Sequence, residues 1–122
     1  EEQDTYEQFL VKKDVQFIEK IHQVIEENLD NSDFNIDTIA STIGLSRSAF
    51  FKKLKSLTGF APVDLVKEIR LNKSIELIKN SDMSISEIAF AVGFKDSGYF
   101  SKCFRKKYDQ TPREYMNEWR KG

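Results

Sequence analysis

The chain has 122 residues and a formal net charge of −1, with 39% hydrophobic and 32% charged residues. This length allows one hydrophobic core or two small adjoining cores. The lone Cys103 excludes an internal disulfide and a cysteine-based zinc site, and the lone His22 excludes a histidine cluster. No apolar run approaches the ~20 residues of a membrane helix, and the acidic N-terminus is the reverse of a signal peptide.

These features predict a cytoplasmic chain with no cofactor, no metal site and no membrane contact by this fragment. The first residue is not Met, so we expect the chain to be part of a longer protein. Apolar residues follow helical spacing, while strand alternation and an Asn-Gly hairpin signal are absent, so the predicted fold class is all-α. No Gly-rich phosphate loop or catalytic constellation is present, and we expect no enzymatic activity.

Residues 1–13 are expected to form a loosely ordered lead-in or linker. A first helix is predicted over residues 14–29, followed by a loop at residues 31–33. The apolar stripe of this helix consists of Phe17, Ile18, Ile21, Val24, Ile25 and Leu29.

A first helix-turn-helix is predicted over residues 36–58. Gly44 ends its first helix, since glycine adopts the left-handed conformation without a Cβ clash, and Ser46 is a good N-cap for the second. Gly59 closes the unit. The helix before the turn buries Ile36, Ile39, Ala40 and Ile43, and the helix after it buries Phe50, Leu54 and Leu57. The opposite face of the second helix consists of Ser48, Phe51, Lys52 and Lys55.

A linker helix is predicted over residues 62–80, with Pro62 in its first turn. A second helix-turn-helix follows over residues 84–108, with Ser84 and Glu87 as a capping box. Either Asp96 or Ser97 caps its second helix. A last helix starts at Pro112. The second helix of this unit has an outward face of Ser97, Ser101, Lys102 and Arg105. The last helix is expected to be capped by Thr111 and to face inward with Tyr115, Met116 and Trp119.

The two helix-turn-helix segments are copies of one another. Ile36, Ala40 and Gly44 recur 49 residues later as Ile85, Ala89 and Gly93. Charge is also divided along the chain: residues 1–37 carry 11 acidic and 3 basic side chains, whereas residues 38–122 carry 9 acidic and 16 basic ones. A helix-turn-helix that occurs twice, each time with a basic second helix, indicates a protein that reads two successive major grooves of double-stranded DNA.

The motifs resemble the DNA-binding domain of the arabinose-operon regulator (AraC/XylS) family over roughly residues 14–119. The second copy carries the most distinctive part. The matching stretches include 39–40, 44–46, 57–62, 85–89, 92–96, 99–102, 104–105 and 111–112. Three positions depart from the family pattern, namely Asp109 in place of a usual Gly, Ser74 in place of Ala, and Phe51 in place of a polar side chain. Asp tolerates the left-handed conformation, so the turn at residue 109 should survive.

The resemblance implies about seven helices in two helix-turn-helix subdomains joined by a long central helix. It also implies a transcription regulator, most similar to the C-terminal output domain of a hybrid two-component response regulator. The nineteen residues of the central helix span ~28 Å, close to one ~34 Å turn of DNA. RNA polymerase is a candidate further partner, and the parent protein is a candidate dimer. The implied DNA contacts are Arg47, Ser48, Phe51, Lys52, Lys55, Ser97, Gly98, Ser101, Lys102 and Arg105.

Some roles have competing interpretations. Lys52 and Lys102 suit guanine and Phe51 suits a thymine methyl group, but Phe51 also adjoins Phe50 and is a candidate for the core. The alternative to DNA contact for Lys55, Arg105 and Lys106 is that these side chains are only part of the solvated surface. Arg70 is expected to donate a hydrogen bond or form an ion pair inside the domain. The alternative function is a helical protein-interaction module with a helix-turn-helix shape.

Overall fold

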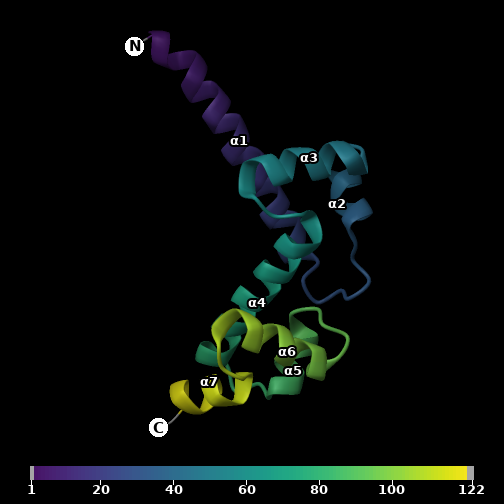
Figure 1. Ribbon diagram of the computed structural model, residues 1–122, viewed down its shortest axis with the longest axis vertical. Helices are drawn as coiled ribbons and strands as arrows, with labels where there is room; N and C mark the ends of the chain where they lie inside the picture. The colour runs from purple at the N-terminus through teal and green to yellow at the C-terminus, as the bar shows by residue number, and fades with distance from the viewer. Residues whose placement is uncertain (1, 121–122) are drawn as a thin grey trace. The chain divides into compact units, whose positions relative to one another are not determined.

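The computed structural model describes residues 2–120, with side chains from residue 5, and this part of the chain contains only helices (Figure 1). The all-α class with seven helices is therefore confirmed. Residues 1, 121 and 122, which belong to the predicted lead-in and DNA-binding segments, lie outside the described part. The helices are α1 (Glu2–Glu27), α2 (Ile36–Thr42), α3 (Arg47–Thr58), α4 (Pro62–Asn80), α5 (Ile85–Ala91), α6 (Ser97–Tyr108) and α7 (Pro112–Trp119).

The helices form two compact units. The first unit consists of α1 with residues 35–66, and the second consists of residues 28–34 with the chain from residue 67 on. Each unit contains one of the predicted helix-turn-helix segments, α2–α3 or α5–α6. The helix α4 begins in the first unit and contributes residues 67–80 to the second.

The loosely ordered lead-in expected over residues 1–13 is wrong for the described residues, because α1 is helical from Glu2. The helix ends at Glu27 rather than Leu29. The lead-in contains no Pro or Gly and is rich in Glu, Gln and Lys, which favour helix. The apolar side chains of Tyr6, Phe9 and Val11 in this segment are exposed. The helix therefore continues by propagation from its packed half, which begins near Phe17.

Both helix-turn-helix turns have the same backbone hydrogen bonds. After α2, Gly44 N donates to Ser41 O at 3.1 Å and Leu45 N donates to Ala40 O at 2.9 Å. After α5, the equivalent bonds join Gly93 N to Phe90 O at 3.0 Å and Phe94 N to Ala89 O at 2.9 Å. This pair of bonds defines a Schellman motif, whose glycine is left-handed, and φ is +78° at Gly44 and +94° at Gly93. The repeat seen in the sequence is therefore a repeat of backbone geometry.

The core of the first unit lies between α1, α2 and α3. Phe50 and Leu54 of α3 are fully buried, and the Phe17 ring of α1 meets Phe50 edge-on with ring centroids 6.5 Å apart. Leu57 was expected on the same face as Phe50 and Leu54, but it is 38% exposed. Leu57 lies in the last turn of α3, where it lines an open surface hollow together with Val15 and Ile18 of α1, so it is only partly covered. The buried side chains that α1 and α2 contribute are Ile21, Val24, Ile25, Ile39 and Ala40.

The core of the second unit is dominated by aromatic rings. Phe100 and Phe104 are fully buried on α6, and the Phe94 ring contacts Phe100 with ring centroids 5.2 Å apart. Tyr115 of α7 contacts Phe104 as expected. Trp119, predicted to face inward, is instead 52% exposed and stacks on Tyr115 at the end of the chain's last helix. Lys79 Nζ lies over the Trp119 ring, at 4.1 Å from the ring centre.

Three local predictions, on two helix caps and one left-handed residue, are confirmed. Ser84 and Glu87 form a capping box at α5, and Asp96 rather than Ser97 caps α6. Asp109 adopts the left-handed conformation with φ +61°, as expected for a residue that replaces glycine at a helix end. Ser74 is buried and satisfied, because its hydroxyl donates to Leu71 O at 2.6 Å.

Candidate nucleic-acid interface

The helix α3 has a well-defined start and end. The Ser46 hydroxyl accepts a hydrogen bond from Ala49 N at 3.2 Å, which caps the first turn. At the other end Gly59 is left-handed, and its N–H donates to Lys55 O at 2.9 Å. These two caps fix the length of the helix, and burial of Phe50 fixes its rotation against the core. Its opposite face is exposed, and carries Ser48, Phe51, Lys52 and Lys55.

Phe51 belongs to the exposed face. Its side chain is 46% exposed, whereas that of its neighbour Phe50 is fully buried. Consecutive residues of a helix point about 100° apart, so the two aromatic rings cannot share one face. The core interpretation of Phe51 is therefore excluded, and an exposed aromatic ring lies among the lysines of α3.

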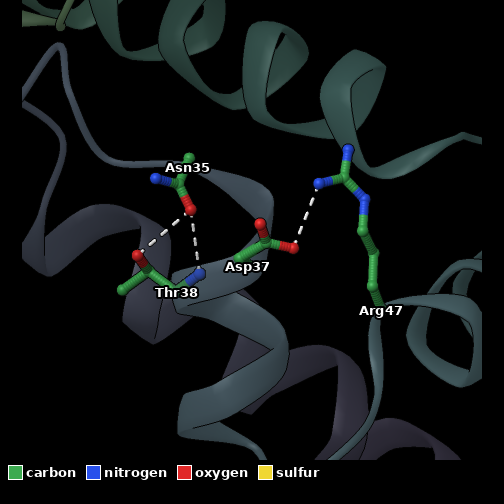
Figure 2. Close-up of polar contacts among 4 residues, drawn as sticks. All are labelled: Asn35, Asp37, Thr38 and Arg47. Carbon is green, nitrogen blue, oxygen red and sulfur yellow. Dashed lines mark hydrogen bonds and ion pairs between the residues drawn. The ribbon is translucent and has the colours of Figure 1, made fainter.

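An ion pair lies at the start of α3. Arg47 Nη1 donates to Asp37 Oδ1 of α2 at 3.0 Å, and both side chains are about two-thirds exposed (Figure 2). In the sequence Asp37 stands out only as one of the N-terminal acids, and this contact was not predicted. The sequence feature that could have revealed this contact is an acidic residue in the first turn of α2, the helix before the glycine turn.

The second unit presents α6 in the same way, with a different N-cap. Asp96 Oδ1 accepts from Gly98 N at 2.7 Å, so its carboxylate is held against the first turn. Gly98 is exposed and has no side chain, which leaves the backbone open to close approach by a ligand. Lys102 and Arg105 are exposed, whereas Ser97 and Ser101 are half-buried.

Tyr99 is a surface residue of α6 that was not among the predicted contacts. It is 50% exposed, its ring packs on Phe94 with centroids 6.0 Å apart, and Lys67 Nζ lies 5.8 Å from the ring centre. Tyr99 lies three residues before Lys102, which places the two side chains on neighbouring positions of the helix surface. That spacing was the signal available in the sequence.

The charge of both helices has one sign. The helices α3 and α6 each contain four basic side chains and no acidic one. In α6 three of these bases occupy the last turn, where the helix dipole favours a cation. Each predicted contact residue is thus accessible or half-buried on a positively charged helix, within its own unit.

Arg70 does not belong to this surface. Its Nη1 donates to Gly93 O at 2.7 Å and its Nη2 donates to Asn31 O at 3.3 Å, so it joins the second turn to the loop after α1. Burial lowers the pKa of the Arg70 guanidinium from its usual value. The predicted role of Arg70 as an internal donor is confirmed.

Comparisons with known proteins agree with this architecture. Residues 39–118 match a family described as a helix-turn-helix domain. The chain is 38% identical over 106 residues to Histidine kinase P4 of Formosa agariphila. The matched region covers 87% of this chain but only 8% of that protein. No helix in the described part of the chain has the length and apolarity required to span a bilayer.

Two solved structures share the fold over most of their length. The C-terminal domain of the two-component response regulator yesN from Fusobacterium nucleatum is 31% identical with a TM-score of 0.73, over 80% of this chain and 95% of that one. The DNA-binding domain of AdpA, a global transcriptional factor solved with a target DNA, is 28% identical with a TM-score of 0.78, over 86% and 93%. This chain therefore belongs to the AraC/XylS family of helix-turn-helix DNA-binding domains.

Proposed function

We propose that this chain is the DNA-reading output domain of a transcription regulator, and that α3 and α6 enter adjacent major grooves of one binding site. The observation that carries the proposal is the duplicated device, in which the same Schellman turn precedes an acid-free helix with four bases. A helix with this charge fits the phosphate-lined major groove. The AdpA domain, which shares the fold, was solved with a target DNA.

We assign base reading to the middle of each exposed helix face. Lys52 and Lys102 are exposed donors of a kind that can reach guanine O6 and N7, and Phe51 offers an apolar surface to a thymine methyl group. The side chains of Ser48, Ser97 and Ser101 and the backbone of Gly98 complete this group. Arg47, Lys55 and Arg105 are assigned to phosphates, where they position the domain without reading sequence.

We also propose a parent protein of the hybrid two-component type. Two observations support this: the similarity to a protein named as a histidine kinase, of which this chain spans 8%, and to a domain from a two-component response regulator. In such a parent, DNA binding takes place in the bacterial cytoplasm. Dimerisation of the parent would raise the apparent affinity through a second linked domain. RNA polymerase is a candidate partner for surfaces of the domain other than the proposed DNA-reading faces of α3 and α6.

The test is selection of bound duplexes from a random pool by this fragment, followed by a salt titration of the selected site. We expect a consensus with two separate half-sites. With about six phosphates neutralised, a plot of log affinity against log salt should have a slope of about −5. Binding that selects no sequence and does not change between ~50 and ~200 mM salt would instead favour the protein-interaction alternative.

A further inference from the structure

Arg47 occupies an unfavourable place for a cation. It is the first residue of α3, where the free N–H groups and the helix dipole create positive potential. The first turn of α3 contains no acidic residue that would offset this potential. The carboxylate that does so comes from outside the helix, since Asp37 lies ten positions earlier, in the first turn of α2.

Asp37 is held in place for this contact by its own helix. The N-cap of α2 is Asn35, whose Oδ1 accepts from Thr38 N at 3.0 Å and from the Thr38 hydroxyl at 3.2 Å (Figure 2). Asp37 is therefore not needed as the cap, and its carboxylate is directed to Arg47. The dipole of α2 favours a negative charge at this position.

The contact is weak enough to be exchanged. The Arg47 and Asp37 side chains are 68% and 66% exposed, and ion pairs at such positions contribute at most ~1 kcal/mol. A DNA phosphate offers the same guanidinium an alternative charge-assisted acceptor, which can also be bound by two parallel hydrogen bonds. A carboxylate beside this guanidinium also repels an approaching phosphate, over roughly the 10 Å that salt screening permits.

We propose that Asp37 competes with DNA phosphate for Arg47 and thereby lowers the sequence-independent part of DNA affinity. The inference depends on the proposed function, because it requires Arg47 to face phosphate. DNA that binds through phosphates alone must displace Asp37 without any compensating base contact. Asp37 thus limits retention on random DNA and leaves base reading to the middle of each recognition helix.

The experiment is a double-mutant cycle by fluorescence anisotropy with the 122-residue chain, using the selected duplex and a random duplex. Asp37→Asn should raise affinity for both duplexes by about 2- to 5-fold at low salt. In the Arg47→Gln background the same substitution should produce a clearly smaller gain, because only the direct repulsion between the carboxylate and phosphate is then removed. Glu19→Gln is the matched control, because it removes one exposed charge from α1 of the same unit and should change affinity much less.

Each other outcome has a definite meaning. A loss of affinity in Asp37→Asn would show that Asp37 positions Arg47 rather than competes for it, and would overturn the inference. An equal gain with and without Arg47, or an equal gain in Glu19→Gln, would reduce the effect to net charge and overturn it as well. If the unmodified chain binds no duplex, the proposed function itself fails. Melting temperatures of all variants separate these effects from unfolding.

Discussion

Arg70 Nη1 donates to the carbonyl oxygen of Gly93 at 2.7 Å, so the second helix-turn-helix turn is fastened to α4 by its own glycine. No space remains for a side chain there. A Cβ atom on Gly93 would lie 2.2 Å from Leu29 O and 2.7 Å from Arg70 Cζ. Gly44 occupies the same place in the first turn, yet a Cβ on it would meet nothing within 4 Å.

This difference predicts unequal costs for the same substitution. Gly44→Ala should cost ~1–2 kcal/mol, the penalty for a left-handed alanine. Gly93→Ala carries the same strain together with a backbone clash, and we expect a loss of at least ~3 kcal/mol. Urea unfolding followed by circular dichroism measures both. Equal losses would show that the second turn relaxes, and that its contacts with Leu29 and Arg70 are not restrictive.

Acid stability should depend on the two capping boxes. Hydrogen bonds from Ser84 lower the pKa of Glu87 below its usual 4.5, and hydrogen bonds from Thr111 do the same for Glu114. A carboxylate with a lowered folded-state pKa stabilises the fold above its unfolded pKa. This stabilisation is lost as pH falls through the folded value.

The melting temperature should therefore decline as pH is lowered from 4.5 through the depressed pKa values of these two groups. In Glu87→Gln/Glu114→Gln this decline should be shallower, because glutamine completes a capping box without titrating. Thermal melts between about pH 6 and pH 3 compare the two proteins. Parallel curves would mean that other carboxylates control acid unfolding.

The first part of α1 should contribute little to stability. Tyr6, Phe9 and Val11 are exposed, so the removal of residues 1–11 should uncover little apolar surface that is buried in the first unit. We expect a change below ~0.5 kcal/mol. Ile21→Ala, at a fully buried position of the same helix, should instead cost ~2–5 kcal/mol. A large loss on truncation would reveal that this segment is packed in solution.

The sequence was sufficient where a single local rule decides the structure. The glycine turns, the Ser46 and Thr111 caps and the capping box at Ser84 follow from backbone conformation and hydrogen bonds within a few residues, and each was predicted. Contacts between distant positions were not predicted in the same detail. Arg47 and Asp37 are ten residues apart, and Arg70 and Gly93 are 23 apart, so no local pattern specifies their partners.

The candidate site shows the same division. Helical spacing identified the exposed face of α3, but it left Phe51 between core and surface until the burial of Phe50 was known. Tyr99 was missed because an aromatic residue beside Phe100 resembles core in sequence. Consecutive residues of a helix point about 100° apart, so only one ring of each pair can face the core, and the packing decides which one.

The two halves of the site should respond to different substitutions. Lys52→Ala and Lys102→Ala should each relax base preference in one half-site, by ~1–3 kcal/mol per base contact. Lys55→Ala and Arg105→Ala should weaken binding to all sequences similarly, and reduce the salt slope by about 1. Repeating the site selection with each variant distinguishes the two classes. If Lys52→Ala behaves like Lys55→Ala, the assignment of base and phosphate contacts on α3 is wrong.

The assigned role of Phe51 can be tested by removing a single methyl group from the DNA. Its exposed ring on α3 is assigned to a thymine methyl group, which deoxyuridine lacks while keeping the same hydrogen-bonding groups. Replacing thymines one at a time in the selected site should reveal one position where affinity falls roughly 4-fold, as expected for one buried methyl group at ~0.8 kcal/mol. In Phe51→Ala that position should become insensitive to the replacement, while the other thymines keep their effects. Phe90→Ala provides the matched control, because Phe90 is an exposed phenylalanine on α5 rather than on a recognition helix. If Phe51→Ala lowers affinity equally for every thymine and deoxyuridine duplex, the ring acts on α3 itself or on the sugar-phosphate backbone, and base reading by the first unit rests on its polar side chains alone.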